Sequence, residues 1–178
     1  MILLHSMVNK ISSYPLALVF IVLVQSAFAS PVSNNSTTDW NTASGWTPSG
    51  VPNLVIWNGS QHAVVSHNKT SGSLIVKNGN SIRVTSGAIL TINGNLTLGY
   101  SSSLTVDIGA TLIITGSLLA TNSPSTITID GVLNVGGNYS VSTSGVTHNH
   151  SGFVSVGGNM SVIGNTNIKV LGLSLIHI

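Results

Sequence analysis

The chain has 178 residues, of which only 4% are charged and none is cysteine. Without cysteine it can form neither disulfides nor thiolate metal sites, and five scattered lysines and arginines cannot neutralise a run of nucleic-acid phosphates. The length corresponds to one domain, and with 5% aromatic residues we do not expect a core of large side chains.

Residues 1–29 have the three parts of a secretory signal peptide. Lys10 supplies the positive charge, the apolar run Leu16–Val24 follows, and Ala27–Ala29 reads Ala-Phe-Ala, a small-x-small cleavage site. The apolar run is too short for a membrane span, which needs about 20 residues. We therefore expect cleavage near Ala29, a secreted or cell-surface location and no membrane span in the mature chain; the alternative is a buried N-terminal helix.

After a short polar linker at 30–38, the segment 39–68 contains all three tryptophans, Trp40, Trp46 and Trp57. A stack of repeats needs a cap, because its first coil otherwise exposes an apolar end and an unpaired strand edge. We predict that this aromatic, proline-punctuated segment is the cap and includes the first strands. The alternative is a platform on which sugars stack against open aromatic faces.

The heptapeptide VGGNYSV at Val135–Val141 returns as VGGNMSV at Val156–Val162. A fixed repeat of this kind indicates a repeat architecture. Glycines also precede short apolar runs in steps of 15, 22, 22 and 21 residues, at Gly72, Gly87, Gly109, Gly131 and Gly152.

The runs alternate apolar and polar residues, as in Leu90–Ile92 and Leu96–Leu98. A period of two predicts strands with one buried face. Three short strands and three turns per coil of about 21–22 residues predict an all-β fold, a right-handed parallel β-helix over 69–172. The alternative is a flat β-sandwich, which does not need a fixed period.

Equivalent residues touch along such a stack, so similar side chains are favoured at each level. We expect stacked asparagine amides to hydrogen-bond along one corner. The predicted columns are an inward one of Leu96, Leu118, Tyr139 and Met160, an outward one of Thr97, Leu119, Ser140 and Ser161, and a corner one of Asn80, Asn95, Ser117, Asn138 and Asn159.

The segment DWNTASGWTPSGVPNLVIWNG is followed by GSLIV, GAILTINGNLTL and GVLNVGGNYSV. From Asp39 to Val170 this order resembles the N-terminal region of large bacterial surface and secreted proteins, many of them exported by the type IX secretion system. The resemblance implies an extracellular β-helix of adhesin-like or structural type. Possible partners are extracellular glycans and host or matrix surfaces.

The last six residues, LSLIHI at 173–178, break the repeat pattern. They match a translation of the transposon end used in sequencing libraries, and we interpret them as an adapter scar. The chain is then expected to be a fragment of a larger exported protein. A terminal apolar strand is the alternative.

Asp107 and Asp130 occupy equivalent places one coil apart. They fit turn residues that bond the backbone, a cation site such as Ca²⁺, or a carboxylate pair at a glycosidase-like spacing. We favour the turn, because the chain has no glutamate to serve as the acid and we expect no Arg or Lys beside the pair.

His148 and His150 lie two residues apart and could begin a metal site. No third ligand is evident, so we favour a solvated loop. Several Asn-x-Ser/Thr sequons, including those at Asn95, Asn138 and Asn159, follow from the repeat itself.

We therefore predict a non-catalytic extracellular surface module with no catalytic, cofactor-binding or metal-binding residues and no nucleic-acid partner. The alternatives are the N-terminal part of a polysaccharide-active β-helix enzyme, and a sugar- or ice-binding module. The latter would use Trp40, Trp46 or rows of outward threonines, which Ile113 and Leu119 are expected to interrupt.

Overall fold

The computed structural model describes residues 30–55, 61–122, 124–143 and 145–162, and the backbone of 168–170. The predicted signal peptide at 1–29, Trp57 and the hexapeptide at 173–178 lie outside the described residues. Within them the chain is built from short strands, with one 3₁₀ turn, η1 (Ala43–Gly45).

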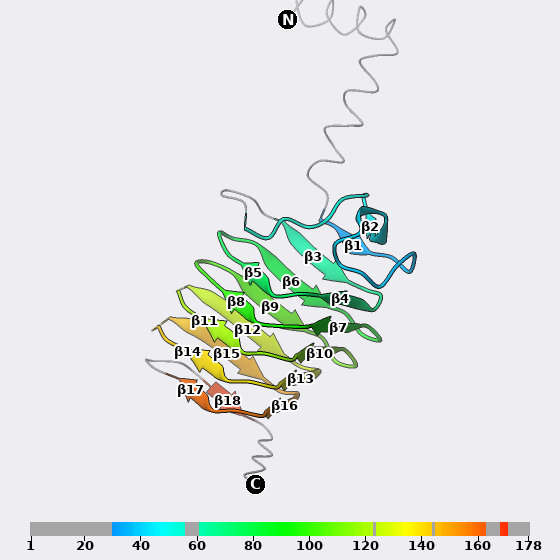
Figure 1. The fold of residues 1–178 in the computed structure, drawn as a ribbon. Coiled ribbons are helices and arrows are strands. Elements are labelled where there is room, and N and C mark those ends of the chain that lie inside the picture. The colour runs from blue at the N-terminus through cyan, green and yellow to red at the C-terminus, as the bar shows by residue number, and fades with distance from the viewer. Residues whose placement is uncertain (1–29, 56–60, 123, 144, 163–167, 171–178) are drawn as a thin grey trace, which may run out of the picture.

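The strands stack into a parallel β-solenoid of about five turns, which confirms the predicted β-helix (Figure 1). Each coil contributes one strand to each of three sheets, which we call A, B and C. In that order the coils are β3 (His62–Val65), β4 (Lys69–Ser71), β5 (Leu74–Val76); β6 (Ser81–Val84), β7 (Ile89–Ile92), β8 (Leu96–Leu98); β9 (Ser103–Val106), β10 (Thr111–Ile114), β11 (Leu118–Ala120); β12 (Ser125–Ile129), β13 (Val132–Val135), β14 (Tyr139–Val141); and β15 (Val146–His150), β16 (Phe153–Val156), β17 (Met160–Val162). Strand β18 (Ile168–Val170) continues sheet A beyond β15.

The strand register confirms the predicted coil length. In sheet C, Leu96 pairs with Leu118 and Leu118 with Tyr139, offsets of 22 and 21 residues. Each strand pairs with its equivalent in the neighbouring coil, so backbone N–H and C=O groups are satisfied between coils. This pairing makes sequence similarity between coils physically favourable.

The glycine alignment of the first coil is wrong. Gly72 precedes β5 in sheet C, whereas Gly87 precedes β7 in sheet B, so the 15-residue step joins two different corners. The true equivalent of Gly72 is the corner before β8, and the stack already begins at β3. The first coil was hard to recognise because Lys69 and Ser71 stand where later coils have inward apolar residues.

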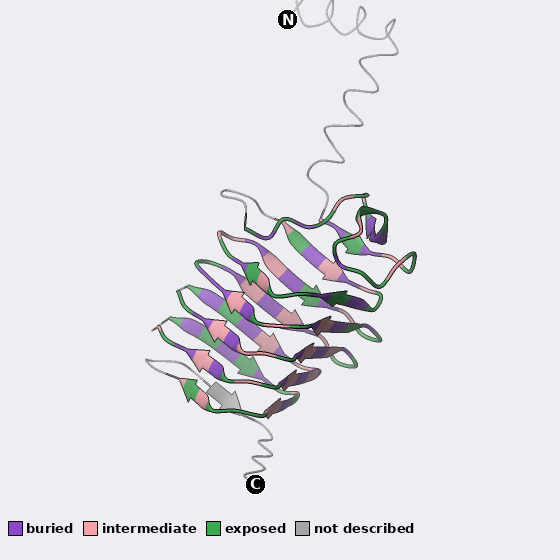
Figure 2. Ribbon diagram, in the orientation of Figure 1, coloured by how far each residue is buried: buried purple, intermediate pink, exposed green. Residues whose placement is uncertain are grey.

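Inward side chains of the three sheets pack into one apolar core, which fills the bore of the solenoid. Buried and less buried residues alternate along the strands (Figure 2). Leu96, Leu118 and Tyr139 are fully buried and Met160 is partly buried, so the predicted inward column is confirmed. The predicted outward column of sheet C is also in register. Burying one such side chain stabilises the fold by about 1.5–3 kcal/mol, and the bore repeats this gain at every level.

The predicted corner ladder exists, but its bonds run from backbone to side chain. The N–H of Ser117 donates to Oδ1 of Asn95 (2.8 Å), and the N–H of Asn138 donates to Oγ of Ser117 (3.0 Å). The N–H of Asn159 donates in turn to Oδ1 of Asn138 (2.9 Å). Each side chain therefore satisfies a backbone donor of the next coil where the strand pairing is interrupted.

The first rung of this ladder is Ser73, whose Oγ accepts from the N–H of Asn95 (3.0 Å). Asn80 was wrongly assigned to the column. It precedes β6 in sheet A, and its amide donates to the carbonyl of Lys77 (2.6 Å). The error has the same origin as the glycine alignment, since corners of different sheets carry similar residues.

The N-terminal segment covers the first strand of all three sheets. Strand β1 (Val32–Ser33) pairs with β3 in parallel and with β2 (Trp46–Thr47) in antiparallel orientation. The N–H of Trp40 donates to the carbonyl of Thr70 in β4 (2.9 Å), and the carbonyl of Leu54 accepts from the residue after β5. Because β1 belongs to sheet A, 32–33 are part of the cap rather than of a linker.

Two buried indoles form the centre of the cap. The ring centroids of Trp40 and Trp46 are 4.7 Å apart at an interplanar angle of 73°, an edge-to-face pair, and Nε1 of Trp46 donates to the carbonyl of Trp40 (2.9 Å). Such pairs add about 0.5–1.5 kcal/mol to the burial of the rings. The indoles thus close the apolar end of the bore, as a cap requires.

Lys69 is the first residue of an inward column whose next member is Leu90. The lysine is only 1% exposed. Its ammonium donates to the carbonyls of Asn34 (3.1 Å) and Thr37 in the cap and lies 5.6 Å from the ring centroid of Trp46. Burial lowers the pKa of the Lys69 amine, with the charge of Asp39 opposing the shift. The lysine thereby ties the first coil to the cap.

Candidate functional site

The outward surface of sheet A carries two neighbouring rows of mainly hydroxyl and amide side chains, which we call the hydroxyl face. All its members are exposed or half-exposed. Adjacent strands are about 4.8 Å apart, so the rows present a regular array of donors and acceptors. By strand register the rows are Ser81, Ser103, Thr126 and Thr147, and Arg83, Thr105, Thr128 and Asn149.

The expected interruption of the threonine rows is wrong for this sheet. Ile113 belongs to β10 in sheet B and Leu119 to β11 in sheet C, so neither lies on the hydroxyl face. Sequence alone mixes the outward positions of three sheets. Only the register separates the sheets and shows that Ser103, Thr126 and Thr147 form one row.

Arg83 forms an ion pair with Asp107 at the edge of this face. Its Nε donates to both carboxylate oxygens, at 3.1 and 3.0 Å. The expectation that no arginine lies beside the aspartates is therefore wrong. Arg83 pairs with Thr105 in the next coil, and Asp107 lies just beyond the end of that strand, two residues after Thr105. The Arg83 side chain is 60% exposed, and such a pair contributes only about 0–1 kcal/mol.

Asp130 is the equivalent of Asp107, since Ile129 pairs with Val106. Its Oδ1 accepts a hydrogen bond from the hydroxyl of Ser151 in the next coil. Both carboxylates therefore bond a side chain of a neighbouring coil, where the turn interpretation expected bonds to the backbone. Both are also half-exposed, whereas a glycosidase acid is kept protonated by burial or by a nearby like charge. Within the described residues, no three His, Cys, Asp or Glu side chains form a metal-binding group.

The solvated-loop interpretation of His148 and His150 is wrong. Both are inward residues of β15, 0% and 4% exposed. In the preceding coil their register partners are Ile127 and Ile129. The two imidazoles therefore stand in aliphatic columns of the bore.

The histidines meet Tyr139, a residue that sequence reasoning assigned only to packing. The Tyr139 hydroxyl lies 2.9 Å from Nδ1 of His148 and 3.3 Å from Nε2 of His150. The rings of Tyr139 and His150 are nearly parallel, 11° apart, with centroids separated by 6.0 Å. The three side chains form one hydrogen-bonded cluster inside the bore, which we call the Tyr–His–His cluster.

Burial controls the ionisation of this cluster. It lowers the pKa of His148 to about 4, with the neighbouring His150 adding to the shift, and it also lowers the pKa of His150. Burial raises the pKa of the Tyr139 phenol far above its ordinary value. All three groups are consequently neutral near pH 7.

The tryptophan platform is not available for sugars at Trp40 and Trp46. The two residues are 2% and 1% exposed, so their ring faces pack inside the cap. This geometry contradicts the use of these two rings for carbohydrate stacking. If the chain binds glycans, the hydroxyl face is the better candidate within the described residues.

No protein-family model, curated protein or solved structure matches this chain. In the part of the chain that the structure describes, no helix has the length and apolar character of a membrane span.

Proposed function

We propose that the chain is a non-catalytic, adhesin-like surface module of a larger exported protein. In this role the stacked coils serve as a rigid spacer, and the hydroxyl face contacts extracellular glycans or host and matrix surfaces. The resemblance to exported bacterial surface proteins and the signal-like leader support the extracellular location.

The observation that carries the proposal is the hydroxyl face itself. Its Ser and Thr hydroxyls both donate and accept hydrogen bonds, as do the hydroxyls of sugars. The face follows successive coils of one sheet, so an extended polymer could contact several levels at once. Repeated weak contacts of this kind gain apparent affinity through multivalency.

The binding role is tested on a glycan array with the purified chain. Replacing Thr126 and Thr128 together by alanine should reduce binding at least several-fold, because both side chains lie on the hydroxyl face. The matched control replaces Thr91 and Thr97 by alanine on sheets B and C and should leave binding unchanged. Equal losses in both variants would contradict the assignment.

The export function of the leader is tested with an epitope-tagged chain expressed in a Gram-negative bacterium. Osmotic shock should release the tag of the full chain with the periplasmic proteins, whereas a chain beginning at residue 30 should stay in the cells until lysis. Release of reducing ends from a panel of polysaccharides by the purified chain would instead favour the enzymatic alternative.

A further inference from the structure

The Tyr–His–His cluster brings three potential metal ligands to one point of the bore. The Tyr139 hydroxyl is shared between ring nitrogens at 2.9 and 3.3 Å, and the two imidazole centroids are 5.5 Å apart. The residues come from two strands, β14 in sheet C and β15 in sheet A. The sequence alone does not show this grouping, because it arises only when the chain winds into coils.

Hydrogen bonding alone does not satisfy this cluster. The Tyr139 hydroxyl can donate to one ring nitrogen and accept from the N–H of the other, but Nε2 of His148 is buried with no hydrogen-bond partner among the described residues. If Nδ1 of His148 accepts from the tyrosine, Nε2 is an unpaired donor; if Nδ1 donates, Nε2 is an unpaired acceptor. A metal ion on Nδ1 would leave Nε2 protonated and still unpaired, so the meeting of three ligand-type side chains, rather than this atom, points to a shared ion.

The three polar residues also stand where the preceding coils have apolar ones, on two consecutive inward-facing strands, β14 and β15. Tyr139 follows Leu96 and Leu118 in its column, and His148 and His150 follow Ile127 and Ile129 in theirs. Independent drift would scatter such changes along the bore. Three replacements that contact one another indicate a joint role.

We propose that Tyr139, His148 and His150 bind one divalent transition-metal ion, of the Zn²⁺ or Cu²⁺ type, inside the bore. The ligand atoms are Oη of Tyr139, Nδ1 of His148 and Nε2 of His150. Tetrahedral ligands at about 2.0–2.1 Å from zinc are about 3.3 Å from one another. The oxygen–nitrogen separations of 2.9 and 3.3 Å are already close to this value.

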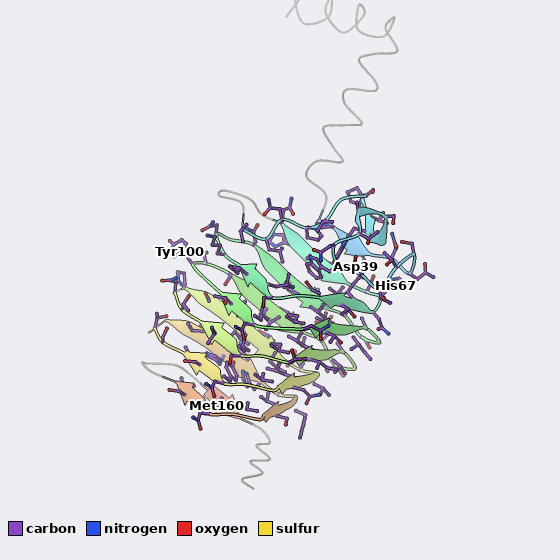
Figure 3. All side chains as sticks on the ribbon, viewed as in Figure 1. Asp39, His67, Tyr100 and Met160 are labelled. Carbon is purple, nitrogen blue, oxygen red and sulfur yellow. The ribbon has the colours of Figure 1, made fainter. Side chains whose placement is uncertain are left out.

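Binding of the metal ion releases one proton, that of the Tyr139 hydroxyl. The imidazoles bind as neutral ligands, the phenol O–H bond breaks, an oxygen–metal bond forms, and the proton leaves to solvent. Affinity should consequently rise about tenfold per pH unit while the free tyrosine remains protonated. The next residue in the tyrosine column is Met160, which Figure 3 labels in the last coils. Thioethers are copper-type ligands, so copper is a useful second probe.

The test uses the full chain unfolded in denaturant with a chelator, then refolded with Zn²⁺, Cu²⁺ or no metal, because the buried cluster must be loaded as the coils close. After desalting we expect one ion per chain, a higher melting midpoint with metal, and a visible phenolate-to-copper charge-transfer band. Tyr139→Phe should abolish the band and weaken binding by at least the roughly 10–100-fold typical of losing a supporting residue.

Two further variants keep the test decisive. The double variant His148→Ile/His150→Ile restores the residue type of the preceding coil, so it should fold and bind no metal. Replacing the exposed His62 and His67 by alanine should leave stoichiometry and affinity unchanged. If Tyr139→Phe does not fold, Tyr139→Leu, which matches the column, takes its place. Wild-type affinity in the tyrosine variant, or no stoichiometric metal in the refolded wild type, would overturn the proposal.

Discussion

The two ends of the bore contain polar side chains in inward columns, but they neutralise them differently. At the cap, Lys69 keeps its ammonium next to the carbonyls of Asn34 and Thr37 and beside the Trp46 ring. In the last coils, His148 and His150 share the Tyr139 hydroxyl. A charge is thus tolerated where loop carbonyls reach it, whereas burial keeps the imidazoles of the last coils neutral.

The largest expected effect on stability comes from a substitution in the cap. Trp46→Ala removes a buried indole, its edge-to-face contact with Trp40 and its hydrogen bond to the backbone. We expect the free energy of unfolding to fall by about 3–5 kcal/mol, the usual range for removing a buried aromatic residue. Urea unfolding followed by circular dichroism measures this loss.

The matched control is Tyr100→Ala, since Tyr100 projects from a corner and is 56% exposed (Figure 3). It should change stability by less than about 0.5 kcal/mol. Similar losses in the two variants would mean that the indole does not close the bore.

The second prediction concerns the histidine end and pH, measured without metal and with a chelator. The folded state lowers the pKa of His148 from 6.5 to about 4. As the pH falls below 6.5, the unfolded chain therefore takes up the proton first. Stability is complete above about pH 6.5 and decreases down to about pH 4, by about 3 kcal/mol for a shift of this size.

Urea midpoints at several pH values between 7 and 4 test this sign, with His148→Ile as the comparison. The variant should lose the part of the pH dependence that His148 contributes, while His150, whose pKa burial also lowers, keeps its own part. Asp39 has a lowered pKa because the Asn41 N–H and the Thr42 hydroxyl bond its carboxylate, and its acid-sensitive contribution is present in both proteins. Parallel pH curves would show that the buried imidazole is not responsible.

A smaller effect is expected at the charge of the cap. Lys69→Met preserves an apolar stem that suits the column but leaves the carbonyls of Asn34 and Thr37 without their donor. The expected cost is about 1–3 kcal/mol. The matched control is Lys77→Met at an exposed position, which should be nearly neutral. A Lys69→Met variant more stable than the wild type would show that the buried ammonium destabilises the cap.

The stack could be predicted because its physical cause is repetition. Leu96, Leu118 and Tyr139 repeat at the coil period, and each contacts its equivalent. The ladder at Asn95, Ser117 and Asn138 was found for the same reason, although the direction of its hydrogen bonds depends on backbone geometry that the sequence does not contain.

The polar residues of the bore were not predicted from the sequence, because His148 and His150 were placed by their polarity and not by their position in the repeat. Aligning THNH with the preceding TITI places His148 and His150 below Ile127 and Ile129, so the signal was present in the repeat. Aligning Lys69–Ser71 with Leu90–Ile92 in the same way places Lys69 in the inward column of Leu90. In a solenoid, the place in the coil is a stronger guide to burial than polarity.

The smallest expected effect tests whether the corner ladder is uniform between the two ends. Asn95→Ala, near the cap, and Asn138→Ala, near the histidines, each remove one side-chain acceptor for a backbone N–H of the next coil. Because both corners are exposed, water can replace the acceptor, and each loss should be about 0.5–1.5 kcal/mol. Asn138→Ser should recover most of it, since Ser117 already performs this role with a hydroxyl. Asn149→Ala on the hydroxyl face is the control for removing an exposed amide. A loss at Asn138 that serine does not recover would mean that the amide supports the histidine end itself rather than the corner.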